Sequence, residues 1–359
     1  MYHKWSIWFV WIMAIFTVQG QLKIQAENFL TTSTLDVVQQ SEQALCWDAA
    51  TIEGEMTEET FEDFISSVGQ GEGLYFDVRP TSSDITPIGN GTYHVLTDTS
   101  VEVSVSIFTP SPSEQNLRYM VLLNEKPMPQ IITESGELYY QDITVNPNEI
   151  YTINFQIPAL ENGINDFIFL AIPDFNAPPS PLGGRVNYAP RMTLISGEPT
   201  NPDLVYENLR EVGLISNNDP LISLELTLGD DLRVWNYPEA YLTLKQGEDL
   251  KFNVVVGTNT AVNLDAPSEA RSRFAIVTFL DYQTISVEDI SPTLYGEVTY
   301  DTAYTRIPIE LTPDLPIGQY DLLVLKINNP RVPMCVMRDR AGSFNPFVNS
   351  VRVSIRIEE

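Results

Sequence analysis

A pattern that occurs twice in the chain restricts the possible folds more than any other feature. The two copies are LENGINDFIFL at residues 160–170 and LPIGQYDLLVL at residues 315–325, and their shared positions keep an offset of 155 residues. An alternating, strand-like run precedes each copy and another ends it, which is typical of a corner between the two sheets of a β-sandwich. The predicted corner residues are Leu160, Gly163 and Asp166 in the first copy, and Leu315, Gly318, Tyr320 and Asp321 in the second.

Short runs rich in β-branched and aromatic residues fill the chain from residue 72 onward. Examples are VEVSVSIF at 101–108 in the first half, and LKFNVVV at 250–256 and RFAIVTFL at 273–280 in the second. Alternation places one side of such a strand in a core and the other in water. The sequence therefore predicts an all-β fold of two tandem antiparallel β-sandwiches. A single barrel or jelly roll is the structural alternative, which the regular repeat disfavours.

The second copy resembles the tyrosine corner of immunoglobulin-like sandwiches. In that class a tyrosine near the start of strand F hydrogen-bonds the preceding turn, and Tyr320 stands at its position between Gly318 and Leu322. The first copy has Asn165 where the second has tyrosine. The strands lack the cysteines and tryptophan of antibody domains, so residues 72–357 resemble the broad bacterial Ig-like or fibronectin type III class. This resemblance implies two Ig-like sandwiches.

The first twenty residues have the three parts of a secretory signal peptide. Lys4 supplies a positive charge, residues 5–18 are apolar, and Gly20 is a small residue at the expected cleavage point. The apolar run is shorter than the roughly 20 residues that span a bilayer. We expect cleavage and secretion to the extracellular space or cell envelope, without integral membrane contact afterwards. An uncleaved anchor is the alternative.

These signals divide the chain into five parts. Between the leader and the first sandwich, Phe61, Phe64, Ile65 and Val68 follow Thr57 at helical spacing, which predicts a short amphipathic helix. The expected parts are the signal peptide 1–20, a partly helical segment 21–71, the first sandwich 72–197, a linker 198–220 and the second sandwich 221–359.

Charge and motif content exclude several function classes. With 48 acidic and 20 basic residues the chain has a formal net charge of -28, which repels nucleic acid. Beyond the leader His94 is the one histidine, whereas hydrolytic triads and zinc sites usually need more than this. We therefore expect no enzyme, no cofactor and no metal. Calcium at Asp219 or at Asp230 and Asp231 stays open, although no calcium-loop spacing supports it.

Two modifications follow from the expected secretion. Cys46 and Cys335 would meet an oxidising compartment, where a pair tends to form a disulfide, although two buried thiols are the alternative. Asn90 begins the sequence NGT, which fits both an N-glycosylation acceptor and a turn.

The long connections after each predicted strand F, residues 174–191 and 328–350, are the candidate binding loops. They carry arginines and aromatic residues that would bind a carboxylate, an anionic glycan or an acidic surface. In the alternative, these arginines pair with the protein's own carboxylates while the loop packs on the neighbouring domain. The candidate residues are Arg331, Arg338, Arg340 and Phe344 in the second loop, and Arg185 and Tyr188 in the first.

The sequence as a whole indicates a secreted, noncatalytic protein of adhesion or envelope structure, which presents Ig-like domains to protein or glycan at the cell surface. One alternative is a carbohydrate-binding accessory or a hydrolase that uses two carboxylates. Another is a passive subunit of an extracellular assembly.

Overall fold

The computed structural model describes most of the chain beyond residue 72. The described ranges are 73–176, 188–198, 203–213, 224–227, 242–257, 271–285, 292–299, 304–311, 315–334 and 348–359, together with Ile65, and without residues 83, 90, 97–99, 134, 135, 159 and 210. Ile65 is helical and is the one described residue of the predicted amphipathic helix. The signal peptide, Cys46, Cys335, Asn90 and the aspartates considered for calcium lie outside the described residues. Within them, no helix is long and apolar enough to cross a membrane.

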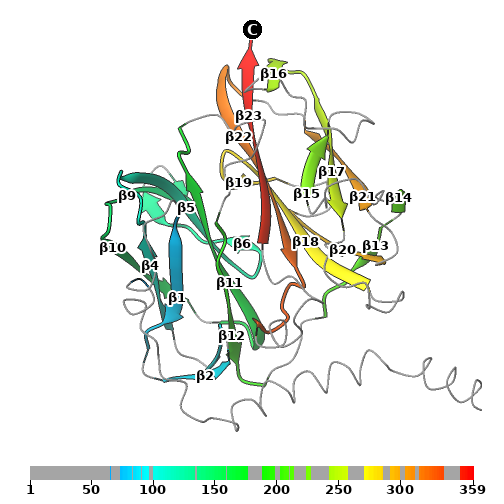
Figure 1. Ribbon diagram of the computed structural model, residues 1–359. Helices are drawn as coiled ribbons and strands as arrows, with labels where there is room; N and C mark the ends of the chain where they lie inside the picture. The colour runs from blue at the N-terminus through cyan, green and yellow to red at the C-terminus, as the bar shows by residue number, and fades with distance from the viewer. Residues whose placement is uncertain are drawn as a thin grey trace, which may run out of the picture. The chain divides into compact units, whose positions relative to one another are not determined.

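Strands β1 to β12 form the first sandwich (Figure 1). Its smaller sheet has the order β1-β4-β10, and its larger sheet the order β2-β3-β12-β11-β5, with β6 and β9 both paired to β5. A separate hairpin joins β7 to β8. The strands are β1 Tyr75–Pro80, β2 Ile85–Gly89, β3 Thr92–Val95, β4 Val101–Phe108, β5 Gln115–Leu123, β6 Lys126–Pro127, β7 Ile131–Thr133, β8 Gly136–Leu138, β9 Tyr140–Val145, β10 Ile150–Ile157, β11 Gly163–Pro173 and β12 Arg191–Ser196.

Strands β13 to β23 form the second sandwich. Its smaller sheet has the order β14-β21-β17-β15, and its larger sheet the order β13-β20-β18-β22-β23-β16, with β19 also paired to β18. The strands are β13 Glu207–Asn208, β14 Glu211–Gly213, β15 Leu224–Thr227, β16 Leu242–Lys245, β17 Leu250–Gly257, β18 Arg271–Leu280, β19 Gln283–Thr284, β20 Thr293–Thr299, β21 Tyr304–Leu311, β22 Gly318–Asn328 and β23 Val348–Glu358.

The two sandwiches repeat one strand order. Strands β1, β4 and β10 correspond to β15, β17 and β21, while β3, β12, β11, β5 and β9 correspond to β16, β23, β22, β18 and β20. In both, a short early strand runs parallel to the last strand of the larger sheet, as β3 does to β12 and β16 to β23. This arrangement confirms the predicted all-β fold of two Ig-like sandwiches.

Each sandwich has its own core, built by strands with alternating apolar residues. On β4, Val101, Val103 and Val105 point into the first core. On β17, Phe252 and Val254 point into the second core. The predicted linker, residues 198–220, contains β13 and β14, which pair with β20 and β21, so part of this segment belongs to the sheets of the second sandwich.

Candidate functional site

Both repeated corners are closed by a side chain that bonds back to the preceding turn. The Tyr320 hydroxyl donates to the carbonyl oxygen of Pro316 at 2.9 Å, which is the contact expected of a tyrosine corner. In the first copy the Asn165 Nδ2 donates to the carbonyl oxygen of Glu161 at 2.8 Å. Glu161 precedes Pro316 by the same 155 residues, so asparagine and tyrosine close equivalent corners at equivalent carbonyls.

The other predicted corner residues also lie at these two turns. Gly163 begins β11 with a φ of 99°, in the left-handed region that favours glycine. Leu160 packs against the first core, and Leu315 packs at the same point of the second. Asp166 and Asp321 do not face these cores. They point to the opposite face of their strands, where the two sandwiches meet.

Asp166 anchors a buried polar cluster on β11 and β12. Its Oδ2 accepts a hydrogen bond from Nη2 of Arg191 at 2.6 Å, and the two side chains are 0% and 1% exposed. Across the ladder Asp166 lies opposite Thr193, whose hydroxyl is 3.5 Å from Oδ1. A charge buried this deeply is stable only because it has an opposite charge and hydrogen bonds.

Asp321 repeats this cluster on β22 and β23. Its Oδ2 accepts from Nε of Arg352 at 3.0 Å, and its Oδ1 accepts from the hydroxyl of Ser354 at 3.1 Å. Asp321 lies opposite Ser354, just as Asp166 lies opposite Thr193, so the strand register is the same in both copies. The duplicated unit therefore includes a carboxylate, an arginine and a hydroxyl on the last two strands of the larger sheet.

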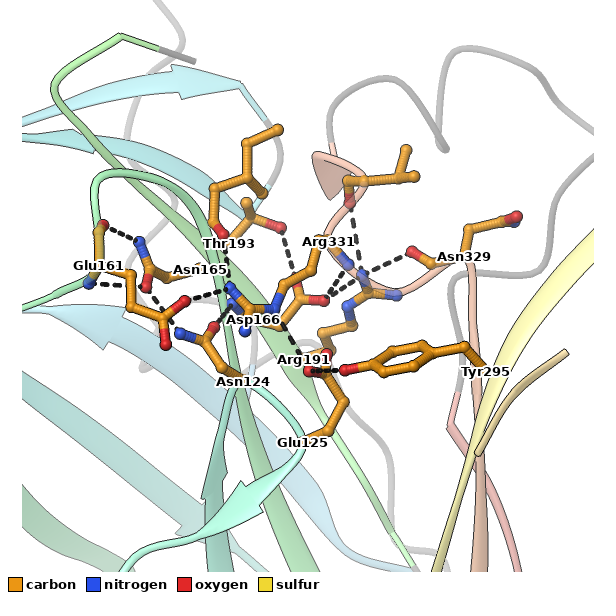
Figure 2. A network of polar contacts seen from close by, with 12 residues as sticks. Asn124, Glu125, Glu161, Asn165, Asp166, Arg191, Thr193, Tyr295, Asn329 and Arg331 are labelled. Atoms are coloured by element: carbon orange, nitrogen blue, oxygen red, sulfur yellow. Dashed lines mark hydrogen bonds and ion pairs between the residues drawn. The ribbon is translucent and has the colours of Figure 1, made fainter. Parts of the chain in front are cut away.

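Each of these arginines reaches into the other sandwich. Arg191 donates to the carbonyl oxygen of Asn328, the last residue of β22, at 2.7 Å, and to that of Asn329, the next residue, at 2.9 Å (Figure 2). Arg352 donates to the carbonyl oxygen of Phe175, just beyond the end of β11. The contact is reciprocal, which is the property of an interface with twofold symmetry between like surfaces.

The apolar side chains between the sandwiches show the same symmetry. Five buried residues of β5 and β11 meet their five counterparts on β18 and β22 in a third core. The register is conserved too, since Leu170 lies opposite Met120 and Leu325 lies opposite Val277. Each such side chain contributes about 1.5–3 kcal/mol when buried. The equivalent pairs are Met120 and Val277, Leu122 and Phe279, Ile168 and Leu323, Leu170 and Leu325, and Ile172 and Ile327.

Two equivalent turns add contacts across the same interface. Asn124 and Glu125 follow β5 with φ of 55° and 64°, and Asp281 and Tyr282 follow β18 with φ of 49° and 66°. Residues other than glycine adopt this conformation at some cost, so surrounding contacts must hold it. In both turns the second residue is the one that crosses the interface. Glu125 accepts from the Tyr295 hydroxyl at 3.0 Å.

Tyr282 is the counterpart of Glu125 and extends from the second sandwich to the first. Its ring lies 4.9 Å from that of Tyr140, and its hydroxyl donates to Asp321 at 2.9 Å. The guanidinium carbon of Arg118 lies 4.1 Å from the Tyr140 ring centre, 4.2 Å from that of Phe175 and 4.9 Å from that of Tyr282. Three aromatic faces around one cation make this end of the interface the more aromatic one.

Arg331 lies in the buried network and not on an open binding surface. Its Nε is 3.3 Å from Glu125, its Nη1 is 3.3 Å from Glu161, and Nη1 also donates to the carbonyl oxygen of Ile164 at 2.9 Å (Figure 2). Its backbone N–H donates to Asp166 at 2.6 Å. The alternative interpretation of the sequence therefore describes Arg331: it pairs with the protein's own carboxylates while its segment packs on the neighbouring sandwich.

Burial strongly affects the carboxyl group of Glu125. Desolvation raises the pKa of Glu125 above its usual value, although the nearby Arg331 charge and the Tyr295 hydroxyl act in the opposite direction. Among the buried atoms of the described residues, Oε1 of Glu125 has no hydrogen-bond partner. A carboxylate in this position is costly to keep ionised.

Of the remaining predicted site residues, the structure describes Tyr188, whose ring lies 5.3 Å from that of Phe76 on the first sandwich. Arg185, Arg338, Arg340 and Phe344 lie outside the described residues. Within the described part of the chain, no group of three or more His, Cys, Asp or Glu side chains could hold a metal ion.

The interface itself was not anticipated from the sequence, although the repeat held a usable signal. Arg191 and Thr193 form an R-x-T pattern, and Arg352 and Ser354 form an R-x-S pattern 161 residues later. Extending the comparison of the two copies beyond strand F would have found both arginines. Chemically, this arrangement of paired charges, hydroxyls and apolar faces binds one sandwich to the other and fixes their orientation.

Comparisons with known proteins give only weak structural similarities. No family model and no curated protein matches the sequence. Among solved structures, the CARDB domain of a Pyrococcus furiosus protein, in complex with di-metal ions, is 11% identical, with a TM-score of 0.25 over 35% of this chain and 88% of that one. Red sea bream transglutaminase is 10% identical, with a TM-score of 0.22 over 86% of this chain and 34% of that one. Neither similarity is strong enough to bear on function.

Proposed function

We propose that this chain is a secreted, noncatalytic protein that uses two Ig-like sandwiches, fixed to each other as one unit, to bind protein or glycan at the cell surface. The observation that supports this proposal is the reciprocal interface. The charged side chains of Asp166, Arg191 and Arg331 are buried and hold the sandwiches together instead of lining an open site. The leader-like sequence of residues 1–20 supports secretion.

A fixed pair of sandwiches suits recognition because it is preorganised. When two binding modules keep one orientation, less conformational freedom is lost on binding, and more of the contact energy appears as affinity. The segments 335–347 and 177–187 supply the remaining candidate residues, with Arg338 and Arg340 as the basic pair. Basic side chains on an acidic protein favour an acidic partner, such as an anionic glycan or an acidic protein surface.

The test begins with cells that express the full chain. Its appearance in the medium, with a mature N-terminus at residue 21, would support secretion, and retention inside the cell would refute it. The secreted protein is then compared with an Arg338→Ser/Arg340→Ser variant for binding to isolated envelope and to acidic polysaccharides. Arg331 is left intact because it is buried.

The matched control is Arg79→Ser, since Arg79 is on β1 with its side chain 49% exposed. Loss of binding in the double variant alone would support recognition by the second loop. Equal binding by all three proteins would refute that role. Release of new reducing ends from any of the polysaccharides would refute the noncatalytic assignment.

A further inference from the structure

Strand β10 forms an edge of the smaller sheet of the first sandwich. It pairs with β4 on one side (Figure 1), and no strand of the described residues pairs with its other side. Its sequence, IYTINFQI, has eight residues and contains neither a charged residue nor a proline. Proteins normally protect long edge strands with charges, prolines or bulges, because unpaired backbone groups bind other strands.

Two comparable positions in the smaller sheets are protected. At the opposite edge of the same sheet, β1 carries Asp77, Arg79 and Pro80. In the second sandwich, β21 is the counterpart of β10, and its outer side is covered by the antiparallel strand β14. The position beside β10 that no described strand occupies is therefore filled by an antiparallel strand in the second sandwich.

Strand β10 also exposes apolar side chains near its start. Ile150 is 39% exposed and Tyr151 is 38% exposed, whereas Phe155 and Ile157, further along the strand, point into the first core. On this strongly acidic chain, an uncharged strip of this kind is a place where two copies can approach without bringing carboxylates into contact.

We propose that β10 pairs antiparallel with β10 of a second copy of the chain, and joins the two three-stranded sheets into one. Identical strands that pair antiparallel use the same surface on both partners, as a twofold dimer requires. The pairing repeats the direction in which β14 binds β21. This proposal is independent of the proposed role at the cell surface, since it concerns association of the chain with itself.

The net charge of -28 sets the conditions of the test. Salt screens the repulsion between two acidic molecules, so the dimer should be tighter at high ionic strength. The full chain is examined by sedimentation over a concentration series at low and high salt. Hydrogen exchange at residues 150–157 is measured at both ends of the series, and protection is expected to rise with concentration.

The test variant is Asn154→Glu/Gln156→Glu, which adds charges at two exposed positions of β10. Like charges on adjacent strands should weaken the dimer by about tenfold or more. The control is Gln319→Glu, an exposed position on β22 of the second sandwich that lies opposite Arg356 of β23. If the double variant loses thermal stability, Gln156→Glu alone replaces it.

The expected result is a salt-strengthened dimer in the parent and the control, and a weaker dimer in the β10 variant. A parent that stays monomeric over the whole series at both salt concentrations would overturn the proposal. So would a β10 variant that associates like the parent, or a control that loses association to the same extent.

Discussion

Replacing Asp166 by alanine tests whether the buried ion pair holds the two sandwiches together. The substitution leaves the guanidinium of Arg191, which is 1% exposed, with carbonyl oxygens as its partners and no opposite charge among the described residues. Removing one partner of a buried pair costs about 3–5 kcal/mol. The backbone N–H of Arg331 also loses its acceptor, so we expect a cost near the upper end, about 4–5 kcal/mol.

The repeat supplies the matched control, Asp321→Ala. Asp321 is 14% exposed and Arg352 is 7% exposed, so water can replace part of the lost interaction. We expect this substitution to cost about 2 kcal/mol, below the range of fully buried pairs. The free energy of unfolding of both variants is measured by urea titration followed by circular dichroism.

The test compares how much free energy of unfolding each variant loses. A larger loss for Asp166→Ala than for Asp321→Ala is expected, with hydrogen exchange rising at the start of β11 and the end of β22 together. An Asp166→Ala variant that loses less than about 1 kcal/mol would refute the assigned role of this pair in stability. Equal losses in the two variants would refute the dependence on burial.

Three further outcomes are expected. Tyr320→Phe removes the corner hydrogen bond to Pro316 and should lower the free energy of unfolding by about 1 kcal/mol in a urea titration. Because the pKa of Glu125 is raised above its usual 4.5, the folded protein binds a proton at Glu125 at a higher pH than the unfolded chain does. The parent should therefore gain stability relative to Glu125→Gln as pH falls from neutral toward 4.5. Thermal melts measure this difference, and a loss of stability in the parent would contradict the prediction. Burial lowers the pKa of Lys326 from 10.5 to about 7, so the unfolded chain binds a proton at Lys326 more tightly than the folded protein does. Lys326→Met should therefore be more stable than the parent at neutral pH by on the order of 1 kcal/mol or more. In the same melts, this difference in stability should shrink as pH rises toward 10.5.

The corner and the sandwiches could be predicted from the sequence because they depend on local patterns. Alternation on β4 and β17 identifies strands, and the spacing from Leu315 to Tyr320 identifies the turn that the tyrosine closes. Asn165 shows the limit of this reasoning. No sequence spacing identifies an asparagine that closes such a corner, yet the Asn165 side chain bonds to the carbonyl oxygen equivalent to the one that Tyr320 uses.

The interface could not be predicted in the same way because it joins residues that are far apart in the chain. Arg191 binds Asn328, and Arg331 binds Glu125 and Glu161, and no local period connects these positions. The sequence does not distinguish Arg331 from the other arginines of the loops, whereas in the structure its side chain is buried. On an acidic chain many carboxylates could pair with a given arginine, and the three-dimensional fold determines which of them does.

The direction of the two F strands has a mechanical consequence. Arg331, beyond the end of β22, lies beside Ile164 at the start of β11, and Phe175, beyond the end of β11, binds Arg352. The strands β11 and β22 therefore run in opposite directions across the interface. A load that pulls the two sandwiches apart along these strands slides one face over the other, instead of peeling them from one edge. The arginine contacts at both ends and the apolar pairs between them then bear the load at the same time, which makes this joint strongest against shear.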